Sequence, residues 1–310
     1  MANNQFLLEY ISQKAIQLFD FQLKNWHTVA TNYTLLQHIE EKTFDFGDCR
    51  VKVQYNPARA TSSNAKIDRQ SISERPCFLC SNQLPPEQKA LPLPDDFNLL
   101  VNPYPIFSPH FTIPNIRHIP QQIMPYFGTM LKISRLLPDF IVFYNGPRCG
   151  ASAPDHLHFQ AAPKGIMPVE QEIETKKKTA KSIDENCFLI QDRLRSYFLI
   201  ESDRESKIES SFQKIYHELA RQDPEEPMLN ILSSSSGNRF RIIIFPRKSH
   251  RPKQYFAEEP EKLIISPGAV DMAGILIISR KKDFDQLTAD DIKSIYDQVS
   301  LRPDECYCCK

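Results

Sequence analysis

The segment APDHLHFQAAP, residues 153–163, carries the side chains of this chain that are best suited to chemistry. His156, His158 and Gln160 alternate there with two apolar residues, and a period of two is the period of a β-strand. The strand is therefore expected to present all three polar side chains on one face. A half-buried strand with a polar outer face would explain a single histidine, but it explains three aligned polar groups less well.

This pattern suits nucleophilic catalysis at phosphorus. A neutral imidazole can attack phosphorus and form a covalent intermediate, which divides a difficult transfer into two steps. The other ring nitrogen must be bonded to an acceptor, such as a backbone carbonyl, so that the tautomer is fixed. A glutamine amide on the same face can donate to the phosphoryl oxygens, but it has no acidic proton for a leaving group. The pattern therefore favours transfer over hydrolysis.

A turn-forming segment, NGPRCGAS at residues 145–152, directly precedes the alternating residues. Two glycines, a proline and a serine favour a turn whose backbone N–H groups can bind phosphate. Turns of this composition are common and alone indicate little. Their position next to the histidines predicts an anion site here.

The combined segment NGPRCGASAPDHLHFQ resembles the active-site segment of the histidine-triad (HIT) superfamily. It resembles most the transferase branch: galactose-1-phosphate uridylyltransferase, diadenosine tetraphosphate phosphorylase and GDP-hexose phosphorylase. In that branch the last position is Gln, whereas the hydrolases have His. Three further segments are similar to parts of the superfamily. The strand pair that precedes the active site is similar to NPYPIFSPHFTIPNIRHIP, and a bacterial branch has segments similar to NPARATSSNAKID and RPCFLC. The end of the GDP-hexose phosphorylases is similar to SPGAVDMAGILIISRKKDF. The resemblance covers residues 49–165 well and 230–300 loosely.

The resemblance implies a role for each matching residue. His158 matches the nucleophile that becomes nucleotidylated, and Gln160 the residue that bonds the α-phosphate oxygens. His156 precedes them in the catalytic segment. The implied substrate-binding residues are Asn145, the turn residues Gly150 and Ser152, and three basic candidates for the distal phosphate, Arg59, Lys66 and Arg148.

Cys77 and Cys80 form a Cys-x-x-Cys pair, which is half of a tetrahedral zinc site. Close cysteine pairs in a cytosolic chain favour metal binding over a disulfide. The resemblance to the uridylyltransferases implies that His118 and His156 complete a structural zinc site. His110 is the alternative third ligand, and buried thiols without metal remain the other interpretation.

The composition limits the class of protein. The chain has 310 residues, 41% of them apolar, with 38 basic and 38 acidic residues, so no global charge favours nucleic acid or membrane binding. We find no signal peptide and no apolar run of transmembrane length, and we therefore expect a cytoplasmic protein. A homodimer stays open. The tail ECYCCK, with Cys306, Cys308 and Cys309, is expected to be disordered, with metal binding as the alternative.

The expected fold is α+β: a HIT-like antiparallel sheet with packed helices, built from two related HIT-like halves. An internal echo between FTIPNIRHIP (111–120) and IIIFPRKSHRP (242–252) supports the duplication. The expected divisions are an N-terminal helical segment at 1–48, a catalytic HIT-like half with the zinc site at 49–165, a helical insertion at 166–229, and a second HIT-like half with the tail at 230–310.

The expected function is nucleotidyl transfer through a covalent nucleotidyl-histidine. The donor would be a nucleotide sugar or a dinucleoside polyphosphate, and the acceptor phosphate or a sugar phosphate. A HIT-type hydrolase is the alternative within the class, and a non-catalytic, zinc-stabilised nucleotide-binding protein is the alternative outside it. The identity of the base stays open, because no residue pattern indicates it.

Overall fold

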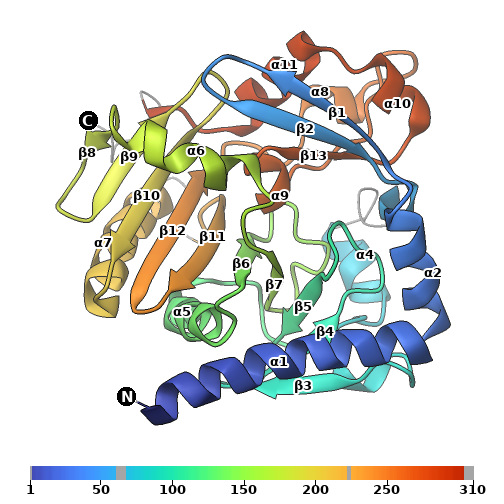
Figure 1. Ribbon diagram of the computed structural model, residues 1–310. Coiled ribbons are helices and arrows are strands. Elements are labelled where there is room, and N and C mark those ends of the chain that lie inside the picture. Colours follow the sequence, from blue (N-terminus) through green and yellow to red (C-terminus); the bar gives the residue numbers. More distant parts are fainter. Residues whose placement is uncertain (1, 61–67, 222–224, 304–310) are drawn as a thin grey trace.

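The computed structural model describes residues 2–60, 68–221 and 225–303, and its main element is a ten-stranded sheet (Figure 1). Neighbouring strands of this sheet are all antiparallel, in the order β3-β4-β5-β7-β6-β11-β12-β10-β9-β8. The strands are β3 (Ala90–Leu93), β4 (Phe97–Val101), β5 (Phe111–Pro114), β6 (Phe140–Asn145), β7 (His158–Pro163), β8 (Lys181–Ser182), β9 (Cys187–Gln191), β10 (Ser196–Ser202), β11 (Leu229–Ser236) and β12 (Arg239–Pro246).

A second sheet of three strands contains β1 (Glu40–Asp45), β2 (Arg50–Tyr55) and β13 (Ile275–Ile278), with β13 parallel to β2. The strand β2 therefore pairs both with its neighbour in sequence, β1, and with β13 from the far end of the chain. The helices are α1 (Ala2–Asn25), α2 (His27–Leu36), α4 (Arg69–Glu74), α5 (Phe127–Leu136), α6 (Pro168–Lys177), α7 (Glu205–Ala220), α8 (Lys253–Phe256), α9 (Ala269–Met272), α10 (Lys281–Gln286) and α11 (Ala289–Val299). The expected α+β class is confirmed.

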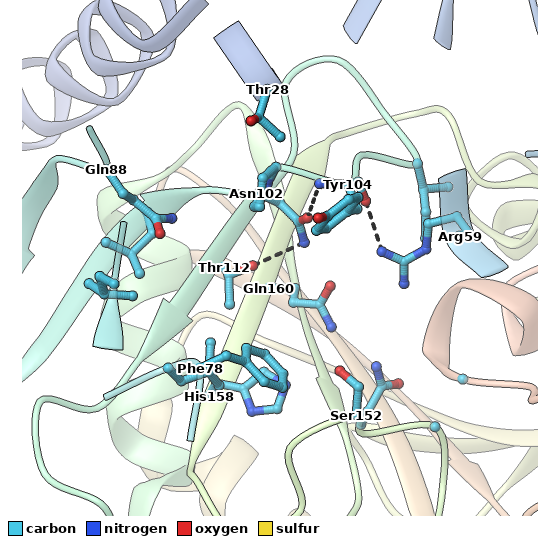
Figure 2. Close-up of a pocket in the computed structure, with 18 of the residues that line it drawn as sticks. Thr28, Arg59, Phe78, Gln88, Asn102, Tyr104, Thr112, Ser152, His158 and Gln160 are labelled. Carbon is cyan, nitrogen blue, oxygen red and sulfur yellow. Dashed lines mark hydrogen bonds between the residues drawn. The ribbon is translucent and has the colours of Figure 1, made fainter. Parts of the chain in front are cut away.

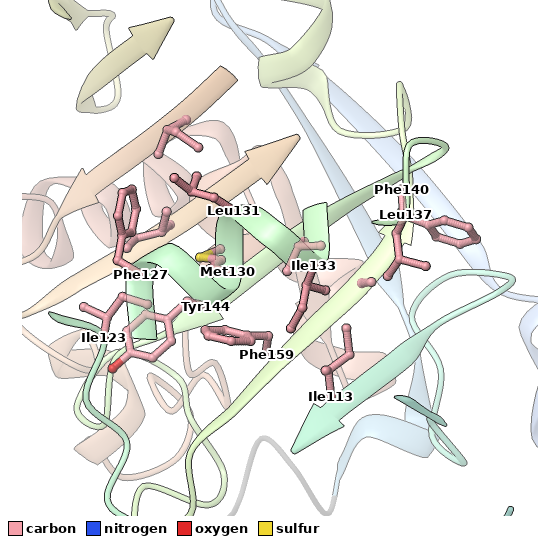
Figure 3. Packing of buried hydrophobic residues seen from close by; sticks show 14 of the residues in the cluster. Ile113, Ile123, Phe127, Met130, Leu131, Ile133, Leu137, Phe140, Tyr144 and Phe159 are labelled. Atoms are coloured by element: carbon pink, nitrogen blue, oxygen red, sulfur yellow. The ribbon is translucent and has the colours of Figure 1, made fainter. Parts of the chain in front are cut away.

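The large sheet is buried on both faces, which explains the continuous apolar run of β6. Alternate residues of β6 enter different cores: Val142 and Tyr144 pack with α1, α5 and α7, whereas Ile141 and Phe143 pack towards α6, α9, α11 and the small sheet. Figure 3 shows the first of these cores beneath α5. On β7, Phe159 enters this helix-side core, so the polar residues of that strand face the other way.

The strand order is symmetric about the pairing of β6 with β11. Outward from this centre lie β7, β5 and β4 on one side and β12, β10 and β9 on the other, and each set is built as hairpin, helix, hairpin. The two expected halves are therefore present. The sequence echo that suggested them, however, joins β5 to β12, and these strands do not hold equivalent positions.

The segment 166–229 differs from the helical expectation. It contains α6 and α7, but also β9 and β10, which form the first hairpin of the second half. The charged run ETKKKTAK at 174–181 suggested a continuous helix, and the apolar residues that follow it were not recognised as the strands β9 and β10. The final helix, α11, begins with a capping box between Thr288 and Asp291. No helix among the described residues has the length and apolarity needed to span a bilayer.

The packing of α5 on α7 gives a test of the helix-side core. The rings of Phe127 and Phe212 stack with centroids 3.7 Å apart, and Phe212 is buried. Phe212→Ala should lower the free energy of unfolding by about 3–5 kcal/mol, because it leaves a cavity between the two helices. Phe256→Ala is the control, since this ring is 71% exposed, and it should have little effect. Chemical denaturation measures both, and equal losses would contradict this view of the core.

Candidate functional site

A cavity of about 1060 Å³ opens on the polar face of β7. Both halves of the chain line it, because β4, β5 and β7 meet there with the segment Ser266–Asp271 that precedes β13. Figure 2 shows His158, Gln160, Ser152 and Arg59 around this space. The site residues expected from sequence are therefore mostly brought together in one cavity.

His158 is held as a single neutral tautomer. Its Nδ1 lies 2.8 Å from the backbone oxygen of His156, and because a carbonyl only accepts, Nδ1 carries the proton. Nε2 is therefore left with its lone pair. Burial lowers the pKa of His158 to about 4, so the ring is uncharged near neutral pH. A neutral imidazole with one free lone pair is what attack on phosphorus requires.

Gln160 is oriented by a histidine whose role the sequence analysis did not find. The backbone N–H of Ile106 donates to His110 Nδ1 (3.2 Å), so His110 Nε2 carries the proton and donates to Gln160 Oε1 (3.0 Å). With Oε1 occupied, the Nε2 donors of Gln160 are left for the cavity. Burial, helped by the charge of Arg59, lowers the pKa of His110 to about 3, which keeps this donor neutral.

Asn145 is oriented by the second half of the chain. Its Oδ1 accepts hydrogen bonds from the backbone N–H of Ala269 (2.7 Å) and from Asn230 Nδ2 (2.9 Å). Asn230 in turn accepts from the buried Arg247 guanidinium at 2.6 Å. With Oδ1 occupied, Asn145 offers its Nδ2 donors to the cavity, as Gln160 does.

The turn after β6 approaches the second half closely. Gly150 has φ of +95°, and a Cβ there would lie 2.6 Å from the Cα of Gly268. Only glycine fits this position, because it adopts the positive φ without strain and leaves room for Gly268. Ser152 also lines the cavity. The turn expected from sequence therefore lies at the edge of the cavity, against the second half.

The three basic candidates have different outcomes. Arg59 lines the cavity, and its Nη1 donates to the backbone oxygen of Tyr104 at 2.8 Å. Burial lowers the pKa of Arg59 to about 10, so the guanidinium remains charged near neutral pH. Arg148 is directed elsewhere, because its Nη2 donates to the backbone oxygen of Glu226, and it does not line the cavity within the described ranges. Lys66 lies outside the described residues.

Cys77, Cys80, His118 and His156 form one cluster, in which the ligand atoms all lie within 4.8 Å of one another. The Cys77 Sγ lies 3.3 Å from His156 Nδ1, and the Cys80 Sγ lies 3.3 Å from His118 Nδ1. A tetrahedral ion with bonds of about 2.0–2.3 Å requires ligand separations of about 3.3–3.8 Å. The cluster therefore fits a metal ion with two sulfur and two nitrogen ligands.

The histidines of this cluster are also prepared for a metal. His156 Nε2 donates to the backbone oxygen of Asn115 at 2.7 Å, so its Nδ1 keeps a lone pair towards the cysteines. His118 Nε2 lies 3.6 Å from Asp155 Oδ2, a common partner of metal-binding histidines. His110, the alternative ligand, is excluded because both of its nitrogens have the partners described above.

Comparisons with known proteins agree with this fold. The family model "Domain of unknown function (DUF4922)" matches residues 18–163, and "GDPGP1-like, C-terminal domain" matches residues 198–307. No curated protein matches the chain. Both models extend beyond the ranges expected from sequence, into the N-terminal helices and into the segment 166–229.

Solved structures of yeast Ap4A phosphorylase Apa2 are similar along almost the whole chain. One covers 94% of this chain and 97% of its own, with a TM-score of 0.64 and 16% identity. Its complex with Ap4A has the same coverage and identity and a TM-score of 0.61, and the complex with AMP covers 91% and 96%, with a TM-score of 0.58 and 16% identity. At this level of identity the likeness shows the fold alone, and the chain therefore has the fold of this phosphorylase, as the sequence resemblance implied.

Metal analysis tests the cysteine–histidine cluster. Protein purified without added metal should contain about one equivalent of a transition metal, and Cys77→Ser should lower metal affinity by at least about 10-fold, together with the melting temperature. Cys187→Ala is the matched control, because this cysteine is buried in the helix-side core and away from the cluster. It should keep its metal. A folded, metal-free wild-type protein would contradict the assignment.

Proposed function

We propose that this chain, which has the fold of Ap4A phosphorylase, is a nucleotidyltransferase that works through a covalent nucleotidyl-histidine at His158. One observation carries the proposal: His158 Nδ1 donates to its backbone acceptor, so that Nε2 is a neutral nucleophile in a large cavity. The donor amides of Gln160 and Asn145 lie in the same cavity. A protein that only bound nucleotides would not need this tautomer to be fixed.

In the first step, the Nε2 lone pair of His158 attacks the α-phosphorus of the nucleotide. The P–Nε2 bond forms while the bond to the bridging oxygen breaks, and its electron pair leaves with the departing nucleoside polyphosphate or sugar phosphate. The ring gains positive charge, which the His156 carbonyl stabilises through Nδ1–H. The amide groups of Gln160 and Asn145 donate to the equatorial oxygens.

In the second step, an anionic oxygen of phosphate or of a sugar phosphate attacks the same phosphorus. The P–Nε2 bond breaks, and its electron pair returns to His158. Gln160 has no acidic proton for either step, so an acceptor and a leaving group that are already anionic are preferred over water. This favours a phosphorylase or transferase over the alternative hydrolase.

Arg59 is proposed to bind the distal phosphate or the acceptor. Its guanidinium stays charged, it is partly desolvated, and it lies on the side of the cavity formed by Tyr104 and Asp271. Lys66 is proposed for the same role on the sequence resemblance alone. The placement of Arg148 against Glu226 gives it no support for this role.

For the cysteine–histidine cluster we propose zinc in a structural role. Two thiolates and two imidazoles in tetrahedral arrangement are typical zinc ligands, and a site closed by four protein ligands leaves no position for substrate. The ion would be held by Cys77, Cys80, His118 and His156. It would cross-link the N-terminal segment to the start of β7. The protein's own chemistry at His158 needs no Lewis acid.

The donor class is proposed as a dinucleoside polyphosphate or a nucleotide sugar. The structural neighbours include a phosphorylase bound to Ap4A, and the C-terminal family model is described as GDPGP1-like. A cavity of about 1060 Å³ has room for either donor. A cytoplasmic location and a homodimer stay predictions.

Mass spectrometry of the intact protein tests the intermediate. The chain is incubated with Ap4A, GDP-glucose, ADP-glucose and UDP-glucose, and one of these should add the mass of one nucleoside monophosphate. His158→Ala should abolish the labelling and lower turnover at least about 10³-fold, because the nucleophile is lost. His217→Ala on the exposed side of α7 is the control and should label normally. Labelling that survives in His158→Ala would exclude this mechanism.

The acceptor is tested by its effect on turnover. Without an acceptor, the enzyme should release one equivalent of leaving group and stop, and inorganic phosphate or glucose 1-phosphate should restart it. Arg59→Ala should raise the apparent KM for the acceptor about 10- to 100-fold, from the ~1.5–3 kcal/mol of a hydrogen bond to a charged group. Arg221→Ala, on an exposed arginine, should leave this KM unchanged. Steady release of nucleoside monophosphate, independent of every acceptor, would show a hydrolase.

A further inference from the structure

The two strands that carry the site residues separate just where the site begins. The ladder between β6 and β7 runs from Phe140 opposite Pro163 to Phe143 opposite Gln160 and stops there. Two residues further along, the same register would place Asn145 opposite His158. These are the residues that offer the amide donor and the nucleophile, and the ladder does not continue to them.

The side chain of Gln121 takes the place of the missing ladder bonds. Its Nε2 donates to the backbone oxygens of Asn145 (2.9 Å) and His158 (3.0 Å), and its Oε1 accepts from the backbone N–H of His158 (2.8 Å). One carboxamide therefore binds the ends of both strands. It bonds both backbone polar groups of His158 on the side that faces β6.

Gln121 is itself held firmly. It is 1% exposed, its backbone N–H donates to the Pro154 oxygen, and its backbone oxygen lies 3.1 Å from the hydroxyl of Tyr144. That hydroxyl also contacts the buried carboxyl of Glu226, which bonds the N–H of Ile123. The backbone of Gln121 is thus held by two hydrogen bonds, and its buried carboxamide can act as a rigid spacer.

We propose that Gln121 is a positioning residue that sets the separation between His158 and Asn145, and with it the distance from the nucleophile to the phosphate-binding donors. The proposal rests on the proposed function and goes beyond it, because Gln121 touches no reacting atom. A direct ladder bond would draw Asn145 and His158 together and narrow the opening between the strands. The inserted carboxamide keeps them one amide apart while leaving each backbone group satisfied.

The expected consequence is kinetic. Attack on phosphorus needs the nucleophile within about 3–3.5 Å of its target, and a misplacement of about 1 Å can cost roughly 100-fold in rate. Removal of the carboxamide frees the backbone of His158 to move while the nucleophile and the donor amides remain present. Nucleotidylation should therefore become slower, whereas binding of the donor should change little.

The test is single-turnover labelling, with whichever of Ap4A, GDP-glucose, ADP-glucose and UDP-glucose labels the wild-type protein fastest. Gln121→Met keeps the length of the side chain and removes all its hydrogen bonds, and Gln121→Glu keeps the acceptor but loses both donors. The labelled fraction, read from the intact mass, counts the folded and active molecules. The rate constant of labelling is independent of that count, so a loss of stability and a loss of positioning are measured separately.

We expect both variants to lower the labelling rate constant at saturating donor about 10- to 100-fold, with the half-saturating donor concentration changed less than about threefold. Gln122→Met is the matched control, because this neighbouring glutamine is exposed, and it should behave as wild type. Labelling at the wild-type rate constant in either variant, whatever its amplitude, would overturn the proposal. A wild-type protein that no donor labels would instead contradict the proposed function.

Discussion

The hydrogen bond from His158 Nδ1 to the His156 carbonyl is the interaction on which the rest of the site depends. It fixes one of two tautomers, and it leaves Nε2 as the nucleophilic atom. It also places a dipole where positive charge develops during attack. The bond is possible because the two residues are only two positions apart in the chain, so no long-range packing is needed for the contact itself. What long-range packing must supply is a fixed backbone for His156 and His158.

That fixed backbone comes from three directions. His156 lies in the cysteine–histidine cluster through Nδ1 and bonds the Asn115 carbonyl through Nε2. His158 is bonded on the β6 side by Gln121. Because each of these side chains is buried, an unmade hydrogen bond would leave a polar group without water, which is costly. The site is therefore rigid, because any movement would break a hydrogen bond to a buried polar group. A metal at the cluster would act on the nucleophile only through the backbone of His156.

The sequence was sufficient for the local part of this arrangement. Alternation in residues 156–160 predicted the strand that places His158 and Gln160 on the cavity side, but the strand begins at His158, and His156 lies before it in the metal cluster. The Cys-x-x-Cys spacing predicted half of that cluster. The contacts made over long distances were not predictable in the same way. Neither Gln121 nor Asn230 lies in a motif, and their roles come from side chains that meet across 24 to 85 positions of the chain. The strands β9 and β10 were missed because they lie between the helices α6 and α7 and follow a charged run.

Both halves are needed for one site, because each half supplies the partner that orients one of the two donor amides. A glutamine or asparagine amide offers donors to a ligand only when its oxygen is occupied elsewhere, since either end of a free amide can face the phosphate. For Gln160 the first half supplies that partner, through His110. For Asn145 the partners are Asn230 and the N–H of Ala269, both from the second half, and Gly268 packs against the same amide. The second half has no histidine pair of its own on β12, yet it decides which atoms of Asn145 the phosphate meets. The first half thus supplies the nucleophile and the Gln160 donor, and the second half orients the Asn145 donor.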